Sequence, residues 1–425
     1  MNILKKIKMV ADWQLQHPVR FDIIFQNIEE QKTERIRMLW DGMLIQRESV
    51  NHNTKTRSLP EDWLKFTALN QEDISFCELP QAVQVSLTQH LSLDSTHILQ
   101  IKMEDNSSRG WEQGTFYAGM YSLSKISEET VYIEALKTIG EANQWKLGPR
   151  IYHADDHCIG QLYLDLYNLF KDAEMIKDVQ MRFEWIMNHP SMQSIWRKDG
   201  TNRWTWCDAL FMSPPVWTKM SAITGNKDYI DFMDKEWWAT TNHLYDEEEH
   251  LFYRDENYFK MRNSNSTKLF WSRGNGWVIA GLSRILEDMP AEYPSRKYYE
   301  QLYKEMAKKI ASLQSVNGLW NPNLLAHESY PSPEASGSSF FCYALTWGVN
   351  NGLLCKDEYL PVIQKAWKGL NSCVQQDGNL GWVQLPKAAP AEVKEEHTSS
   401  YGVGAFLLAG SEILKIKKDI KGGFN

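Results

Sequence analysis

The 425-residue chain lacks the patterns that mark membrane, nucleic-acid-binding and secreted proteins. No stretch approaches the roughly 18 consecutive apolar residues of a membrane span, so no membrane partner is expected. The net charge of −8 disfavours nucleic acid, which needs concentrated Lys and Arg. The first residues carry lysines but no apolar segment long enough for a signal peptide. We therefore expect a cytoplasmic location, or a periplasmic one if a leader has been removed.

Metal and cofactor motifs are also missing. The six cysteines are scattered without a CxxC pair or zinc-like spacing, and they are predicted to be small buried apolar residues. Gly274 and Gly276 do not complete a GxGxxG motif, and no Gly-x-Ser-x-Gly elbow is present. No group of His, Asp and Glu has metal-ligand spacing. The sequence therefore predicts neither a metal site nor a cofactor.

Aromatic residues are abundant, with 18 Trp, 18 Tyr and 16 Phe. Such side chains pack cores, and their faces also stack on the apolar faces of sugar rings. They make a carbohydrate a reasonable candidate ligand.

The first 105 residues differ from the rest of the chain in their pattern of apolar residues and turn signals. Apolar residues at helical spacing predict a first helix that ends near His17-Pro18. The turn signal Asp41-Gly42 between two apolar-containing runs predicts a hairpin. Two strands are predicted at Ala82–Leu87 and His97–Met103 from their alternation. We interpret 21–105 as a β-rich insertion in a single domain that spans 1–425.

From Trp111 onward, apolar glycine-containing helices alternate with polar amphipathic ones. The openings recur at a spacing of roughly 45–65 residues, the length of a two-helix unit. Apolar helices are expected inside and amphipathic ones outside, and six such pairs predict an all-α (α/α)6 barrel. A helical solenoid is the alternative, although its repeats are usually shorter and more uniform. The predicted amphipathic helices are 128–142, 173–188, 227–242, 295–315 and 358–374.

One carboxylate, Asp208, lies in the aromatic and apolar run Trp204–Pro215. Burial raises the pKa of a carboxyl group, and a group that keeps its proton near neutral pH can act as a general acid. The alternative is an Asp that only caps a helix.

The inner helices of such a barrel begin at one mouth, where their polar residues converge. Asp155 or Asp156 would pair with Asp208, as the two carboxylates do in glycoside hydrolysis. The alternative is that both are helix-opening residues favoured by the helix dipole. Arg273 offers a fork for a carboxylate, and Trp271 and Trp277 offer ring platforms or core packing. His157 is a ligand-facing group or a partner of the adjacent aspartates. The residues expected at this mouth are Glu112, Asp155, Asp156, His157, Trp206, Asp208, Arg254, Trp271, Arg273, Trp277, Ser336 and His397.

Four motifs resemble those of the unsaturated uronyl hydrolases, glycoside hydrolase families 88 and 105. They are Met9-Val-Ala-Asp-Trp-Gln-Leu-Gln16, Asp155-Asp-His-x-x-Gly-Gln161, Trp206-x-Asp208-x-x-Phe-Met-x-x-Pro215 and Trp271-x-Arg273-Gly-Asn-Gly-Trp277. Family 105 is the more similar of the two. The resemblance covers the first helix and residues 109 to the end.

This resemblance implies an (α/α)6 barrel and a metal-free reaction on the oligosaccharide products of polysaccharide lyases. These products carry a 4,5-unsaturated uronic acid, which the family removes by hydrating its double bond. The resemblance makes Asp208 the catalytic acid and base and Asp156 the second catalytic acid, with Asp155 as its rival. It places Trp271, Arg273 and Trp277 at substrate-binding positions. We also expect the polar and aromatic residues near them at the mouth to bind substrate, namely Asp155, His157, Trp206 and Arg254.

The chain departs from the family pattern at two places. The segment 21–105 is outside it, and Tyr253-Arg254 stands where many members have Tyr-His. A permanent cation at Arg254 would bind the uronate carboxylate or a sulfate, unless it is a plain surface charge. The leaving sugar is therefore open between rhamnogalacturonan and sulfated ulvan-type fragments. A conventional inverting glycosidase, a sugar epimerase and a non-catalytic carbohydrate-binding protein are the competing functions.

Overall fold

The computed structural model describes residues 2–17, 20–27, 32–39, 44–50, 71–75, 77, 81–93, 98–103, 108–195 and 203–417. The chain forms two compact units. The first consists of Met1–Trp13 and Ser108–Asn425, and the second of Gln14–Ser107.

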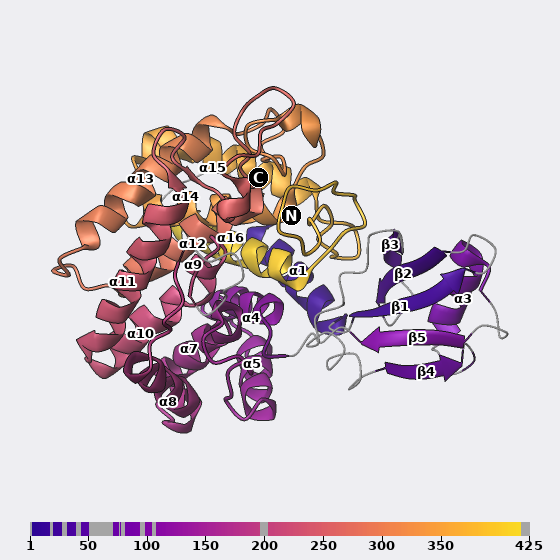
Figure 1. The fold of residues 1–425 in the computed structure, drawn as a ribbon, viewed down its shortest axis with the longest axis horizontal. Coiled ribbons are helices and arrows are strands. Elements are labelled where there is room, and N and C mark those ends of the chain that lie inside the picture. The colour runs from indigo at the N-terminus through magenta and orange to yellow at the C-terminus, as the bar shows by residue number, and fades with distance from the viewer. Residues whose placement is uncertain are drawn as a thin grey trace. The chain divides into compact units, whose positions relative to one another are not determined.

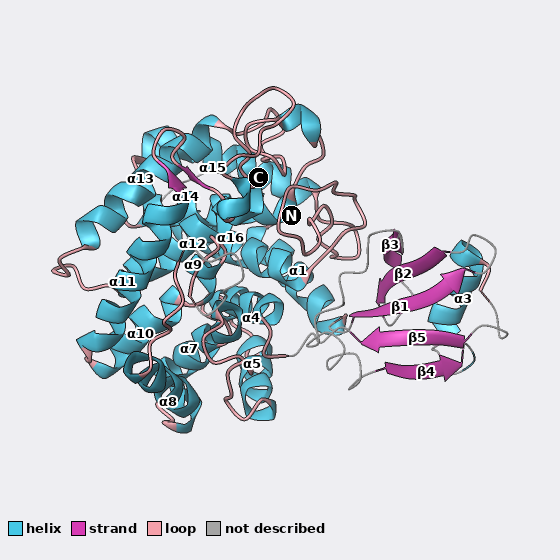
Figure 2. Cartoon of the chain, viewed as in Figure 1, coloured by secondary structure: helices cyan, strands magenta, loops and turns pink. Residues whose placement is uncertain are grey.

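Helices dominate the first unit (Figures 1 and 2). The inner helices are α4 (Trp111–Ser124), α7 (Gly160–Phe170), α10 (Pro214–Thr224), α12 (Ser272–Asp288), α14 (Ala335–Asn350) and α16 (Ser400–Lys417). Each contacts the next, and α16 returns to α4, so the ring closes. The outer helices are α1 (Ile3–Gln16), α5 (Val131–Ala142), α8 (Glu174–Asn188), α11 (Lys227–Leu244), α13 (Arg296–Ser312) and α15 (Lys356–Ser372). This is the predicted (α/α)6 barrel.

The ring of inner helices can close because α4 and α16 each carry a glycine where they meet. A Cβ atom at Gly119 of α4 would lie 2.3 Å from the carbonyl oxygen of Gly404 of α16, so no other residue fits this close approach. The outer helix α13 instead buries one face, which includes Leu302, Met306 and Ile310. The difference between apolar inner and amphipathic outer helices therefore follows from burial on all sides or on one side.

The N-terminal helix supplies the outer partner of α16. A Cβ atom at Gly410 would lie 2.3 Å from Cγ2 of Ile7, which shows how closely α1 packs on α16. On its other side, the Tyr132 hydroxyl of α5 donates to Asp12 at 2.8 Å. The predicted first helix is thus confirmed, and it ends at Gln16.

The second unit holds an antiparallel sheet with the strand order β3-β2-β1-β5-β4. Its strands are β1 (Arg20–Asn27), β2 (Lys32–Leu39), β3 (Leu44–Val50), β4 (Gln71–Ser75) and β5 (Ile98–Met103). The β2–β3 hairpin and the last strand are as predicted. The turn residues Asp41 and Gly42 lie outside the described residues. The segment 21–105 falls inside this unit. Its interpretation as an insertion in one domain stays a prediction.

The predicted strand at Ala82–Leu87 is wrong, because this segment belongs to helix α3 (Gln81–Leu91). A strand would place Val85 and Leu87 on the same face. Instead Val85 is exposed while the adjacent Ser86 and Leu87 are both buried. The short alternation was ambiguous, since Ala, Gln and Leu are good helix formers.

The prediction that all six cysteines are buried is also only partly correct. Cys158, Cys207, Cys342 and Cys373 are buried, whereas Cys77 and Cys355 are exposed. Among the described helices, none is long and apolar enough to cross a membrane.

Short elements in the loops of the barrel carry the polar residues discussed below. They are α6 (Ala154–His157), α9 (Ala209–Met212), β6 (Tyr245–Asp246), β7 (Leu251–Phe252), η2 (Glu256–Tyr258) and η3 (His327–Ser329).

Candidate active site

Asp208 occupies the residue before α9, but its carboxylate accepts no capping hydrogen bond from that helix. The capping interpretation is therefore not supported. Its neighbours Cys207 and Ala209 are fully buried, and the Asp208 side chain is 14% exposed. Burial raises the pKa of Asp208, while the guanidinium groups of Arg254 and Arg273 act to lower it. The result is a carboxyl group that holds its proton more tightly than usual and still touches solvent.

Asp155 on α6 is the second carboxyl group of the site. Burial raises its pKa to about 7, and the charge of Asp208 adds to this effect. Two like charges disfavour the state in which both groups are ionised, so the pair holds a proton to higher pH than an isolated carboxyl group does, and the apparent pKa values belong to the pair. One of them can then donate a proton while the other accepts one.

Asp156, in contrast, is held by Arg150. Its carboxylate accepts from the Arg150 backbone N–H at 2.6 Å, from Nε at 3.0 Å and from Nη2 at 2.7 Å. These hydrogen bonds and the Arg150 charge lower the pKa of Asp156, although burial opposes them. Asp156 therefore ties the 148–153 loop to α6, and the geometry favours Asp155 as the partner of Asp208.

The two histidines of this segment act within the protein. His153 accepts from the Asp155 backbone N–H at Nδ1, and its ring lies 5.0 Å from that of Trp206, centroid to centroid. His157 is hydrogen-bonded at both ring nitrogens, to Ser213 Oγ at 2.7 Å and to the Ile151 carbonyl at 2.8 Å. Burial lowers the pKa of both histidines to about 4, so both are neutral at pH 7. The predicted substrate contact of His157 therefore has no ring nitrogen left to make it.

Arg254 lies beside Asp208. The sequence alone did not decide whether it was a residue of the site or a surface charge. Its Nε atom is 3.7 Å from Asp208 Oδ2, and its Nη1 donates to Asp255 Oδ2 at 2.6 Å. The Cys207 backbone N–H donates to the Arg254 carbonyl at 2.9 Å, which fixes the two loops together. The side chain stays 27% exposed. Arg254 is therefore a cation at the acid, with donors that an anionic ligand can reach.

Arg273 is placed differently from the prediction. Its guanidinium donates to the carbonyls of Gln384, Leu385 and Lys387 and to the Tyr401 hydroxyl. It is 1% exposed. Most of its donors are thus used to hold the 384–387 loop, and its charge reaches Asp208 without an open fork for a substrate.

The two predicted tryptophan platforms are also buried. Trp271 donates its indole N–H to Gln384 Oε1 at 3.0 Å. Trp277 packs in the core against Phe211, Phe340 and Trp111. Each is 1% exposed, so neither presents a face to a sugar ring. Their role in the site is to build the wall that carries Arg273.

The remaining residues expected at the mouth have protein partners. Glu112 accepts from the Ser399 hydroxyl at 3.1 Å, and the Ser336 hydroxyl donates to Glu334 at 2.5 Å. Glu334, which the sequence marks as the start of the family-like motif Glu334-Ala-Ser-Gly-Ser, also accepts from the Gln384 backbone N–H at 3.1 Å. His397 accepts from the Lys394 backbone N–H at 3.3 Å. Gln384 is the missed residue of most consequence, because it joins Trp271, Arg273 and Glu334, and no local motif marks it.

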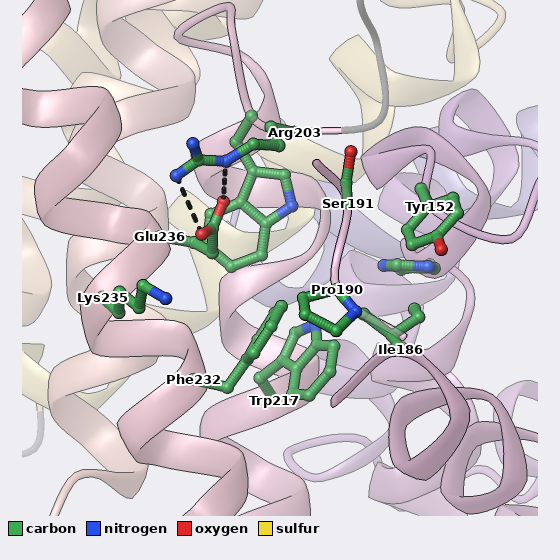
Figure 3. Close-up of a pocket in the computed structure, with 11 residues that line it drawn as sticks. Tyr152, Ile186, Pro190, Ser191, Arg203, Trp217, Phe232, Lys235 and Glu236 are labelled. Atoms are coloured by element: carbon green, nitrogen blue, oxygen red, sulfur yellow. Dashed lines mark hydrogen bonds and ion pairs between the residues drawn. The ribbon is translucent and has the colours of Figure 1, made fainter. Parts of the chain in front are cut away.

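A separate cavity of about 110 Å³ lies between the C-terminal end of α8 and the middle of α11 (Figure 3). Arg203 and Glu236 form a two-pronged pair across it, with N···O distances of 2.7 and 2.9 Å. The Trp217 ring is stacked between Phe183 and Phe232, so its faces are covered. This cavity holds none of the carboxyl groups of the site. Within the described residues, no group of three His, Cys, Asp or Glu is arranged to hold a metal ion.

Comparisons with known proteins assign the chain. Residues 85–417 match the model of Glycosyl Hydrolase Family 88. The chain belongs to this family. Unsaturated 3S-rhamnoglycuronyl hydrolase of Formosa agariphila is 40% identical over 72% of this chain and 85% of the relative. The protein of that name from an Alteromonas species (strain LOR) is 34% identical over 74% and 79%. A solved family 88 hydrolase of Bacteroides vulgatus is 32% identical, covers 72% of this chain and 92% of its own, and has a TM-score of 0.67.

This family 88 protein is thus an unsaturated uronyl hydrolase, and the glycosidase class predicted from its motifs is confirmed. A solved family 105 hydrolase of C. acetobutylicum shares the fold, with a TM-score of 0.60 and 22% identity.

The two adjacent aspartates give a direct test of the site. We expect Asp155→Asn to lower kcat/KM by about 10²-fold or more, within the range for a group that assists proton transfer. The charge of Asp208 raises the pKa of Asp155, and repulsion between like charges is reciprocal, so the loss of the Asp155 carboxylate should lower the pKa of Asp208. The alkaline limb of the pH–rate profile should therefore move to lower pH. Asp156→Asn should cost less activity and leave that limb in place, because its carboxylate is bound to Arg150. A larger loss and a shifted limb in Asp156→Asn would contradict this assignment.

Proposed function

We propose that the protein removes a 4,5-unsaturated uronic acid from lyase-generated oligosaccharides in which the next sugar is a sulfated rhamnose. The relatives are named for a 3S-rhamnoglycuronyl unit, which we take to be a rhamnose with a sulfate at O3. The observation that carries the proposal is the cation beside the acid. Arg254 Nε lies 3.7 Å from Asp208 Oδ2, is buried, and has no hydrogen-bond partner among the described residues.

Asp208 is assigned the protonation step. Its proton adds to C4 of the enol ether, and positive charge develops at C5 and the ring oxygen. Burial raises the pKa of Asp208, so the group keeps its proton to higher pH than an ordinary carboxyl group, as a general acid requires. The two cations near Asp208, Arg254 and Arg273, keep its carboxylate from being too basic once the proton has left.

Asp155 is assigned the activation of the attacking water molecule. A water molecule adds its oxygen to C5 and gives one proton to a carboxylate of the pair. The resulting hemiketal opens at the bond between C5 and the ring oxygen and leaves a ketone at C5. The former ring oxygen stays on C1 as the hydroxyl group of a hemiacetal, which breaks down to an aldehyde at C1 and the free next sugar. One water is consumed for each glycosidic bond broken.

Arg254 is assigned the binding of an anionic group of the substrate. We assign it the sulfate because the relatives are named for a 3S-rhamnoglycuronyl unit and because Arg254 is a permanent cation within reach of a bound anion. Sulfate accepts from a guanidinium in the same forked way as carboxylate and phosphate. A histidine at this position would carry the charge only below its pKa, whereas Arg254 carries it at every physiological pH.

The substrate assignment is tested with sulfated and desulfated forms of one unsaturated disaccharide. We expect Arg254→Met to lower kcat/KM about 10–100-fold on the sulfated form, because a hydrogen bond to a charged group contributes about 1.5–3 kcal/mol. The desulfated form should lose little. Arg262→Met removes an exposed arginine of the same loop region and serves as the control. Equal losses on both forms would instead make Arg254 the site for the uronate carboxylate.

A further inference from the structure

We propose that Asp255 is a positioning residue, which holds the Arg254 guanidinium away from Asp208 so that Asp208 can carry the proton it donates. This inference rests on the proposed function. The three charged groups form a row. Arg254 Nη1 is 2.6 Å from Asp255 Oδ2, whereas Arg254 Nε is 3.7 Å from Asp208 Oδ2, which is beyond a hydrogen bond. Two carboxylates compete for one cation, and Asp255 holds it.

Asp255 can do this because it is fixed on its other side. Its Oδ1 accepts from the Asn257 backbone N–H at 2.9 Å and from Asn257 Nδ2 at 2.8 Å, and it caps the short helix η2. The side chain is 12% exposed. With Oδ1 occupied, Oδ2 faces Arg254. The other end of the row is fixed as well, because the Cys207 N–H is bound to the Arg254 carbonyl.

Without the Asp255 charge, Asp208 is the one carboxylate left within ion-pair distance of Arg254 among the described residues. A small rotation of the Arg254 side chain would shorten the 3.7 Å ion pair with Asp208 to a hydrogen-bonded one. A carboxylate paired in this way has a lower pKa and is a poor proton donor at neutral pH. The buried Nε, which lacks a hydrogen-bond partner among the described residues, would gain one by this movement.

Several other groups also face Asp208, and they remain in place. They are Cys207 beside it, Asp155 from α6, Arg273 from α12 and Tyr258 from η2. The effect of Asp255 is therefore measured against a constant background, and the proposal requires that this effect passes through Arg254.

The test is the pH dependence of kcat/KM in Asp255→Asn. Asparagine is an equally good helix cap, so the loop should keep its form. We expect the alkaline limb to move by about one pH unit to lower pH, and activity above that limb to fall about tenfold. Glu248→Gln makes the same charge change at an 80% exposed site and should leave the limb in place. An unmoved limb in Asp255→Asn would overturn the proposal.

A double variant separates positioning from a merely structural role. In an Arg254→Met background, Asp255→Asn should cause no further shift, because the cation that it controls is gone. The same shift in both backgrounds would overturn the proposal. Asp255→Glu, which disturbs the cap but keeps the charge, should retain the wild-type limb. If the wild-type protein does not consume the double bond, the proposed function fails first, and the two failures are thus distinguished.

Discussion

Asp208→Asn is expected to abolish turnover of unsaturated oligosaccharides, with kcat lowered by about 10²–10⁴-fold. This is the contribution of a positioned general acid, and the amide has no proton that it can give to C4. The substitution preserves shape. It also removes a carboxyl group whose pKa is raised by burial, so the unfolding temperature should stay the same or rise.

The measurement is the loss of the ultraviolet absorbance of the conjugated double bond, followed in wild type and variant at equal protein concentration. Glu248→Gln, at an 80% exposed site whose charge pairs with Lys268, controls for the change in net charge and should keep full activity. Turnover in Asp208→Asn within about tenfold of the wild type would reject Asp208 as the proton donor.

Arg273→Met is expected to have the largest effect on stability, about 3–5 kcal/mol of the free energy of unfolding. The substitution removes the donor to the carbonyls of Leu385 and Lys387 and one of the donors to the Gln384 carbonyl, which keeps its hydrogen bond from the Tyr401 hydroxyl. Each buried polar group left unpaired costs about 1–3 kcal/mol, and part of that cost is recovered by local rearrangement. The loss is measured by urea unfolding.

Arg262→Met is the matched control for this experiment. Arg262 also donates to backbone carbonyls, those of Phe259 and Met261, but it is exposed, so water can replace it. Its loss should change stability by no more than about 0.5 kcal/mol. If Arg273→Met unfolds like the wild type but raises KM, the guanidinium binds substrate and the sequence-based prediction would be correct after all.

The barrel could be predicted from the sequence because its signal is local and repeated. The alternation of apolar, glycine-bearing helices with amphipathic ones appears in every pair, and each pair is read independently. The strand predicted at Ala82–Leu87 shows the limit of such patterns. A six-residue alternation fits helix α3 as well, and packing decides between them.

The site was harder to predict, because its geometry depends on distant parts of the chain. Adjacent residues of a helix point about 100° apart, so Asp155 and Asp156 cannot both face Asp208. Only the hydrogen bonds of Arg150 show which one does not. Arg273 was recognised in its motif, but its acceptors begin 111 residues later at Gln384. Nothing near Arg273 in the sequence indicates that its guanidinium donors are already bound to backbone carbonyls.

The most direct test of the central claim is the reaction in deuterium oxide, followed by NMR of the products. Protonation of the double bond predicts that each sugar released is matched by one double bond lost, with one solvent deuteron at C4 of the uronic acid product. A conventional glycosidase would release the same sugar with the double bond intact and no deuterium at C4. That result would contradict the mechanism proposed for Asp208 and Asp155.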